Sequence, residues 1–563
     1  MKALVILLLS FVLLPWALWS QRSVGLLTQE SGVSEGYTLF HPIRSTTTYL
    51  VDNCGREVHR WESAYTPGNS VYLLEDGRLL RTAKTALDAN PVFVAGGAGE
   101  RVQLLDWDGT VLWDFIYSND TMRLHHDIEP LPNGNVLLLT WELVTAEEAL
   151  AAGRNPNLLP DGVLWSERLL EIVPFTNEIV WEWRLWDHLV QEHDPAKANY
   201  GVVAEHPELL DINFTGGPTA DGRADWLHLN AVDYNPDRDE ILLTSPFLNE
   251  LYVIDHSTTT EEAAGHRGGR WDRGGDFLYR WGNPAAYDQG TESDRQFHGV
   301  HDARWIPAAL PEGGNILVFN NGDAVRPWST VDLLEPPIDD YLTGSYVYIP
   351  GTAFLPRQPQ LVYAADPPET FFSSFLSGAQ RLPNGNTLIG AGAQGRFFEV
   401  TPAGDVVWDY VNPVTHEGPV DYNADIPIFA GRNANISFRC TKYGPDYPGL
   451  QGRDLTPGDP LERNFPGPYT CELLTDLAEV AVQRMSVYPV PARDRLTIEF
   501  FESRTRRIRI FDALGRLHWE GSAFRGRLEL AIGNWPPGTY RLIAEAESGR
   551  GAGVAARTFI VLP

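Results

Sequence analysis

The chain has 563 residues, which exceeds what one hydrophobic core usually holds, so we expect more than one folded unit. Its formal net charge of −30 excludes a nucleic-acid-binding protein, because a phosphate backbone is held by basic patches and the sequence contains none of any length. Residues 1–20 contain the charged residue Lys2 near their start, followed by an apolar run, and this pattern predicts a secretory signal peptide. The alternative, a membrane anchor, is disfavoured because the run is shorter than the roughly 20 residues that span a bilayer and is followed by Pro15.

One short pattern recurs six times along the chain: a turn, then β-branched residues, then an aromatic residue. A hairpin whose turn is Pro-Asn-Gly-Asn, or a variant of it, accompanies most copies, and Asn and Gly favour such turns because they accept positive φ. Short strands with an aromatic residue in each repeat, and no convincing long amphipathic helix, predict an all-β fold, a six-bladed β-propeller. The aromatic residues are Trp61, Trp113, Trp181, Trp281, Tyr363 and Trp408, and the hairpins start at Asn69, His126, His228, His301 and Ser377.

Three histidines share one position in the repeat. Aligning two Pro-Asn-Gly-Asn turns sets His126 against Ser377, and His228 and His301 start the corresponding hairpins. Equivalent positions in a propeller lie on one ring, so we expect the three side chains to meet at one end of the central channel. A single histidine at a strand start is usually a structural residue, which is how we interpret five further histidines: His125, His256, His266, His298 and His416.

The cysteines are Cys54, Cys440 and Cys471. Outside the cytoplasm a disulfide is permitted, and we expect one between Cys440 and Cys471, which closes a Gly/Pro-rich segment for roughly 3 kcal/mol in the chain-entropy model. Cys54 then remains in a turn, where a structural or buried thiol is favoured over a catalytic one.

Four stretches resemble the bacterial arylsulfate sulfotransferases. They are "HHDIEPLPNGNVLLLTWE", "DWLHLNAVDYNPDRDEILLTS", "FHGVHDARW" followed by "NILVFNNGDAVR", and "SGAQRLPNGNTLIGAGAQGRFFEVTPAGDVVWDYVNP". Together they lie within roughly residues 45–440, and as a set they are specific. The resemblance implies a secreted or periplasmic six-bladed propeller that moves a sulfuryl group from an aryl sulfate to a phenol without a nucleotide donor or cofactor.

The resemblance also implies site residues. His228 and His301 match histidines that line the family's channel, and Arg326 is similar to the arginine that holds the sulfuryl oxygens. Arginine suits that role because its planar, always charged fork matches tetrahedral oxyanions, and a histidine can exchange a proton with the phenol. His126 is a further catalytic candidate. The expected substrate-binding residues are Asn320, Asn321, Ser377, Gln380 and Arg396.

One stretch departs from the family. The family's nucleophile is a late-blade histidine that forms a sulfo-histidine, whereas "GAGAQGRFFEV" offers only Gln394 and Arg396. Three alternatives stay open: another imidazole such as His126 or His301 serves, transfer is direct, or a non-catalytic surface propeller binds an anionic or aromatic ligand or a partner protein. The His-Asp and Asn-Asn-Gly-Asp pairs lack the dense spacing of a calcium or zinc site, so we expect no metal.

Beyond Cys471 the sequence alternates apolar and polar residues between turn signals, which predicts a small β-sandwich. This tail resembles the C-terminal sorting domain of type IX secretion cargo, except that Val490 replaces a customary Asn. The resemblance implies a partner in the secretion machinery and a route through the periplasm to the cell surface or medium; the alternative is an adhesive or carbohydrate-binding sandwich. The predicted regions are a signal peptide at 1–20, a propeller at 21–475 and a sorting domain at 485–563.

Overall fold

The structure is a computed structural model, which describes residues 23–85, 90–216, 222–466, 471, 485–488, 492–500, 506–512, 516–523, 527–546 and 554–561. The predicted signal peptide and the predicted boundary at residues 475–484 lie outside the described residues. Among the helices of the described part, none combines the length and apolar character that crossing a membrane requires.

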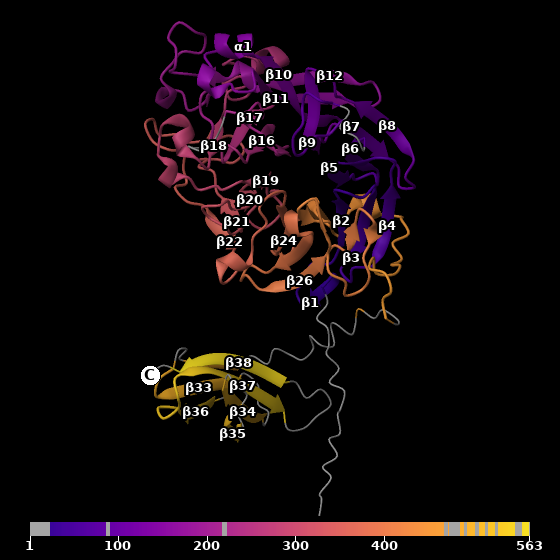
Figure 1. Cartoon of the computed structure of the whole chain (residues 1–563), viewed down its shortest axis with the longest axis vertical. Helices are drawn as coiled ribbons and strands as arrows, with labels where there is room; N and C mark the ends of the chain where they lie inside the picture. Colours follow the sequence, from indigo (N-terminus) through magenta and orange to yellow (C-terminus); the bar gives the residue numbers. More distant parts are fainter. Residues whose placement is uncertain are drawn as a thin grey trace, which may run out of the picture.

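Six antiparallel sheets surround a central axis, so the predicted six-bladed propeller is confirmed (Figure 1). From the axis outward, blade 1 contains β31 (Ser437–Tyr443), β2 (Tyr37–Pro42), β3 (Thr47–Asp52) and β4 (Glu57–Glu62); blade 2 contains β5 (Thr66–Leu73), β6 (Leu79–Lys84), β7 (Arg101–Leu105) and β8 (Val111–Ile116); blade 3 contains β9 (Met122–Pro130), β10 (Val136–Thr145), β11 (Val163–Val173) and β12 (Glu178–Arg184). Blade 4 contains β15 (Ala231–Asn235), β16 (Glu240–Ser245), β17 (Glu250–Asp255) and β18 (Tyr279–Trp281); blade 5 contains β19 (His301–Trp305), β20 (Ile316–Asn320), β21 (Thr330–Leu334) and β22 (Gln360–Tyr363); blade 6 contains β23 (Gly378–Arg381), β24 (Thr387–Ala391), β25 (Arg396–Val400) and β26 (Val406–Val411).

The repeated sequence pattern corresponds to the outermost strand of each blade. Its aromatic residue falls in β4, β8, β12, β18, β22 and β26. Trp61 and Trp408 are fully buried there, because alternate residues of a strand face the neighbouring blade. The hairpins of the second pattern form the two innermost strands of blades 2 to 6. In blade 2 these strands are β5 and β6.

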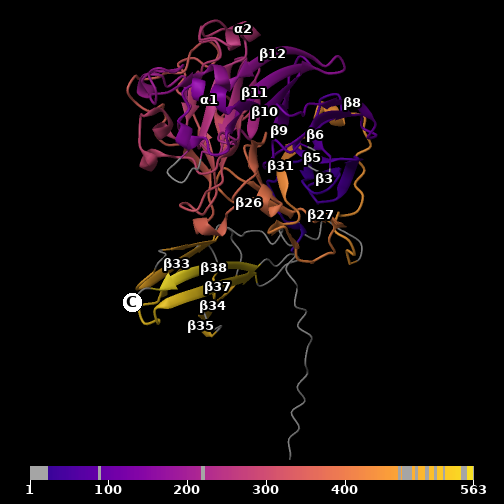
Figure 2. The ribbon, with the colours of Figure 1, turned by 45° about the horizontal axis from the view of Figure 1, so that its top comes forward.

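Two strand pairs close the ring. The innermost strand of blade 1 is β31, which comes from far along the chain and pairs with β2, and Figure 2 shows it in orange beside the indigo strands. At the other end of the chain, β1 (Gly25–Gln29) pairs with β26 and extends blade 6. Backbone hydrogen bonds therefore tie the N-terminal strand to blade 6 and the late strand β31 to blade 1, which closes the ring.

Five of the six innermost strands, all except β31, share an unusual backbone feature. Near their starts lie non-glycine residues with positive φ, a conformation that costs energy for residues other than glycine. Register shifts near these residues in β5, β9 and β19 mark β-bulges, which bend the strands locally. The residues are Asn69, His126, His228, Asp302 and Ser377.

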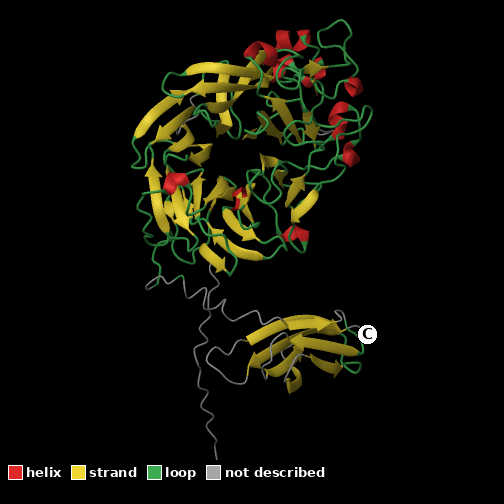
Figure 3. Cartoon of the chain, turned by 180° about the vertical axis from the view of Figure 1, so that it is seen from behind, coloured by secondary structure: helices red, strands yellow, loops and turns green. Residues whose placement is uncertain are grey.

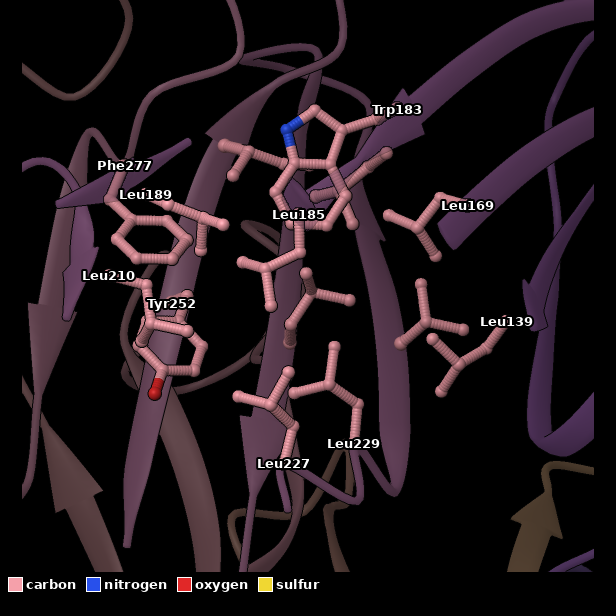
Figure 4. Packing of buried hydrophobic residues seen from close by; sticks show 14 of the residues in the cluster. Leu139, Leu169, Trp183, Leu185, Leu189, Leu210, Leu227, Leu229, Tyr252 and Phe277 are labelled. Atoms are coloured by element: carbon pink, nitrogen blue, oxygen red, sulfur yellow. The ribbon is translucent and has the colours of Figure 1, made fainter. Parts of the chain in front are cut away.

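Helices are short and lie in connections between strands (Figure 3). They include α1 (Ala146–Ala151) after β10 and α2 (Thr260–Ala263) between β17 and β18, and each begins with a capping box, at Thr145 and Thr259. Next to α2, a large apolar cluster joins blades 3 and 4 (Figure 4). Trp183, Leu189 and Phe277 are among its buried members.

The described part of the tail forms two facing sheets, as predicted for a β-sandwich. One contains β32 (Met485–Tyr488), β33 (Arg495–Phe500) and β36 (Arg527–Ala531); the other contains β34 (Arg506–Asp512), β35 (Leu517–Ala523), β37 (Gly538–Ala546) and β38 (Val554–Val561). Ile498, Ile510 and Leu542 belong to its own buried core.

The predicted disulfide between Cys440 and Cys471 is wrong. Cys471 pairs with Cys54 instead, and Cys440 is a buried free thiol in β31. The reason is geometric: β31 pairs with β2, and its Cys440 packs among apolar residues of blades 1 and 6. The observed disulfide links residues 417 positions apart and so ties the β3–β4 turn to the segment that follows the propeller.

Candidate active site

A cavity of about 810 Å³ lies at one end of the propeller axis, and the three histidines of the repeat line it. His126 comes from β9, His228 precedes β15, and His301 begins β19, so three adjacent blades contribute. The ring centroids of His126 and His228 are 4.5 Å apart. The structure thus brings together residues that lie far apart in the sequence because they occupy one position of the repeat.

His228 is oriented by a carboxylate. Its Nδ1 lies 2.6 Å from Oδ2 of Asp225, an acceptor, so this nitrogen carries the proton. The phenyl ring of Phe247 stacks on the imidazole at 4.5 Å. Within the described residues no hydrogen bond occupies Nε2, which leaves this nitrogen for a bound molecule.

His126 ends a buried hydrogen-bonded relay. Its Nδ1 lies 3.0 Å from Nδ1 of His125, whose Nε2 lies 2.8 Å from Oε2 of Glu167. Glu167 also accepts a hydrogen bond from the Leu229 amide, and His125 stacks on Trp141. When Glu167 is ionised, each ring must donate toward it, which leaves a lone pair on Nε2 of His126.

Glycines at residues 96 and 97 cover these two imidazoles. Gly97 accepts a hydrogen bond from the His126 amide. A Cβ on Gly97 would lie 2.0 Å from Nε2 of His126, and one on Gly96 would lie 4.0 Å from Cε1 of His228. The loop therefore needs glycine at residue 97 to leave room at the imidazole.

His301 differs because both of its nitrogens are engaged within the protein. Nδ1 lies 2.9 Å from the Gly299 carbonyl and 2.8 Å from Oδ1 of Asn321, and both of these are acceptors. Nε2 accepts a hydrogen bond from the Leu376 amide at 3.2 Å. Its lone pair is thus occupied, and His301 is better suited to shaping the cavity than to attacking a substrate.

Burial favours the neutral form of His126 and of His301. It lowers the pKa of His126 well below its ordinary value, and His228, His125 and His301 lower it further. Burial likewise lowers the pKa of His301 to about 4 and raises the pKa of Glu167 well above its ordinary value. A neutral His126 retains one lone pair, which lies on Nε2 in the state with Glu167 ionised, and a nucleophile requires such a lone pair.

The cavity walls combine positive charge with aromatic rings. The Arg432 guanidinium lies 4.3 Å from the ring centroid of Phe375, and that of Arg223 lies 5.5 Å from Phe247. Burial, and then repulsion from Arg432, lowers the pKa of Arg44. Such walls match a ligand with an anionic end and an aromatic body. The lining also includes Lys84 and Trp165.

Arg326 lies elsewhere. Its guanidinium donates to the Trp328 carbonyl at 3.0 Å and to Oγ1 of Thr330 at 2.8 Å, and Arg326 does not line the cavity. The expectation that it joins the histidines is therefore wrong, because β21 starts beside it and offers acceptors to the guanidinium. Among the basic lining residues, Arg44, Arg223 and Arg432 lie outside the blade strands, whereas Lys84 ends β6, and no local sequence signal predicts their place in the cavity.

The expected substrate-binding residues are also spread out. Asn321 positions His301, whereas Asn320 bonds to the His298 amide and to Asp332. The other three are engaged by protein groups and do not line the cavity. They are Ser377, bonded to Ser373 and Gly392; Gln380, bonded to Lys442; and Arg396, paired with Asp409.

Buried charged side chains lie next to the histidines. Asp127 and Asp302 directly follow His126 and His301 in the sequence. Arg439 of β31 donates to both Asp127 and Asp302, and Arg304 pairs with Asp302 at 2.7 Å. Arginine lowers the pKa of Asp302 although burial opposes this. A second cavity, of about 540 Å³, includes Arg304, Arg439 and Cys440 but none of the three histidines. The histidine cavity therefore has a charged floor.

A family model of arylsulfotransferases (ASST) matches residues 31–425, which is most of the chain. The chain belongs to the arylsulfotransferase family. This match ends before β31, the strand that completes blade 1, so the folded propeller extends beyond it. A second model, the secretion system C-terminal sorting domain, matches residues 486–552. This arylsulfotransferase-family protein is thus a secreted one, directed by its tail to the cell surface or the extracellular space.

No curated protein matches the chain. Solved structures give distant likenesses. A Bacteroides caccae protein of unknown function is 11% identical, covering 73% of this chain and 99% of that one, with a TM-score of 0.34. A Staphylococcus aureus virginiamycin B lyase is 10% identical, covering 74% and 97%, with a TM-score of 0.30. We draw no argument from likenesses of this size.

Proposed function

We propose that this protein transfers a sulfuryl group from an aryl sulfate ester to a phenol, without a nucleotide donor, through His126 and His228. The observation that carries the proposal is the facing pair of imidazoles, whose Nε2 atoms carry no hydrogen bond in the described structure, inside a cavity with basic and aromatic walls. The family match supports the reaction class.

In the first half-reaction, the Nε2 lone pair of His126 attacks sulfur and the bond from sulfur to the aryl oxygen breaks. His228, protonated at Nε2, gives this proton to the departing phenolate, and Asp225 holds its other N–H throughout. Cationic side chains in the cavity walls offset the negative charge of the sulfuryl oxygens. The first phenol then leaves.

The relay balances the charge that sulfuryl transfer places on His126. The proton on its Nδ1 moves to His125 as the proton of His125 moves to Glu167, so the sulfo-imidazole becomes neutral at the ring. Glu167 suits this role because burial raises the pKa of its carboxyl group. The carboxylate thus acts through His125, and neither touches the substrate.

The second half-reaction reverses these steps with another phenol. His228 removes the phenolic proton, the phenolate oxygen attacks sulfur, and the bond from sulfur to Nε2 of His126 breaks. The relay protons return to their starting positions. His126 thereby replaces the absent late-blade histidine, whose stretch holds Gln394, bonded to the Phe372 carbonyl, and Arg396.

The test uses p-nitrophenyl sulfate with and without phenol. We expect p-nitrophenol release only when phenol is present, and a loss of at least about 100-fold in kcat/KM for His126→Ala and for His228→Ala. The control is His206→Ala, because His206 is 42% exposed and pairs with Glu208 outside the cavity. Full turnover by His126→Ala would contradict the covalent route. Absence of turnover with any aryl sulfate would favour the non-catalytic binding propeller.

A further inference from the structure

Away from the sulfuryl cavity, two imidazoles and a carboxylate converge between blades 3 and 4. His188 ends the turn η2 (Leu185–Asp187), whereas His266 and Asp276 lie on the segment that joins α2 to β18. Nδ1 of His188 lies 2.7 Å, and Nδ1 of His266 2.8 Å, from the same carboxylate oxygen, Oδ1 of Asp276. Donor atoms of all three residues lie within 4.8 Å of one another.

The hydrogen bonds of His188 indicate that a proton or a cation lies between this residue and Asp276. Its Nε2 lies 2.8 Å from the Ala263 carbonyl, an acceptor, so Nε2 carries the proton. A neutral ring then directs the lone pair of Nδ1 at the anionic oxygen of Asp276. His188 is fully buried and Asp276 is 7% exposed, so either a proton or a cation must lie between Nδ1 and the carboxylate oxygen.

We propose that His188, His266 and Asp276 bind a divalent transition metal ion of the zinc class. Two imidazole nitrogens and one carboxylate oxygen form a ligand set that suits zinc and that calcium does not favour. Binding requires these donors to move a few tenths of an ångström apart, to the spacing of ligands on one ion. The side chain of His266 is 60% exposed, so solvent completes the coordination and gives the ion an entry path.

The surroundings fit an outer shell for a metal. Donation from Nε2 of His188 to a backbone carbonyl fixes the tautomer, as is typical for metal-binding histidines. Trp183 stacks on His188 with a centroid distance of 5.8 Å and donates to the Gly275 carbonyl. A Cβ on Gly275 would lie 2.5 Å from Nε2 of His188, so glycine permits the close approach. Figure 4 shows the adjoining apolar side chains, including Trp183, Leu189 and Phe277.

Such a metal site would stabilise the fold by holding two segments of the chain together. It would join the connection after blade 3 to the inserted segment of blade 4, above the apolar cluster that packs those blades together. It shares no lining residue with the sulfuryl cavity and so makes a claim separate from the proposed transfer reaction.

The test measures metal binding by the full chain. We expect chelator-treated protein to take up one equivalent of Zn²⁺ and to unfold at a higher temperature with it. His266→Ala and Asp276→Asn should weaken Zn²⁺ affinity at least about tenfold, and His266→Ala removes an exposed side chain, so its fold is preserved. His206→Ala, which removes an exposed histidine paired only with Glu208, should bind as the wild type does.

Cobalt gives an independent measurement. Co²⁺ should produce a visible absorption of low-symmetry coordination in the wild type and in His206→Ala, and this band should be absent from His266→Ala. Equal Zn²⁺ affinity in wild type and His266→Ala, or no saturable binding at one equivalent, would overturn the proposal. The cluster would then be a buried ion pair in which His188 is doubly protonated.

Discussion

Individual nitrogens decide the chemistry of this cavity. The repeat in the sequence predicts that His126, His228 and His301 converge, since it turns spacing into position on a ring. The repeat does not predict which imidazole nitrogens are free of hydrogen bonds within the protein. The two nitrogens of His301 bond to Asn321 and to the Leu376 amide, which belong to other segments of the chain. Glu167 has no local signal either, since it is recognisable only through its contact with His125.

Gly97 gives a prediction at the same scale. Gly97→Ala should lower turnover by about 100-fold or more, because its Cβ would lie 2.0 Å from the reacting nitrogen of His126. Gly109→Ala is the matched control: Gly109 also has a positive φ, of +86 against +75, and nothing lies within 4 Å of its Cβ position. The measurement is kcat/KM of both variants beside their thermal unfolding. Equal kcat/KM in the two variants would contradict the predicted effect of contact with His126.

At the level of strands, local patterns predict what lies within a blade. The aromatic repeat marks outer strands and the Pro-Asn-Gly-Asn turns mark inner hairpins, because both signals are contained in a few consecutive residues. The closing strands β1 and β31 carry no such signal, since their partners lie at the opposite end of the chain. The wrong disulfide has the same origin, because no residue near Cys440 in the sequence indicates that β31 pairs with β2 as the inner strand of blade 1.

The disulfide gives a second prediction. Cys54→Ser and Cys471→Ser should each lower the free energy of unfolding by about 2–5 kcal/mol, and the double variant should cost no more than either. Cys440→Ala is the control, because it removes the free thiol and keeps the disulfide. Urea unfolding measures the energies, and thiol titration of the denatured wild type should find one free thiol. Three free thiols in the denatured wild type, or alkylation of Cys54 without prior reduction, would contradict the pairing.

The whole molecule consists of an arylsulfotransferase-family propeller and a C-terminal sorting domain. The two family models match separate ranges, 31–425 and 486–552, and the tail has its own apolar core. We therefore expect secretion to depend on the tail, and sulfuryl transfer to depend on the propeller.

Truncation tests this division. Deleting residues from Met485 onward should leave a folded propeller with unchanged kcat/KM that is no longer exported past the outer membrane. Fractionation of cells and an assay of the purified truncated protein measure the two effects separately. A truncated protein that fails to fold would make the tail a structural part of the propeller.

Mass spectrometry after incubation with donor alone tests most directly whether His126 carries the sulfuryl group. We predict a sulfuryl adduct on the peptide that contains His126, formed in the absence of phenol and discharged when phenol is added. The adduct should be missing from His126→Ala and present in His206→Ala. An adduct on His301 or His228, or full turnover with no adduct on any histidine, would contradict the account.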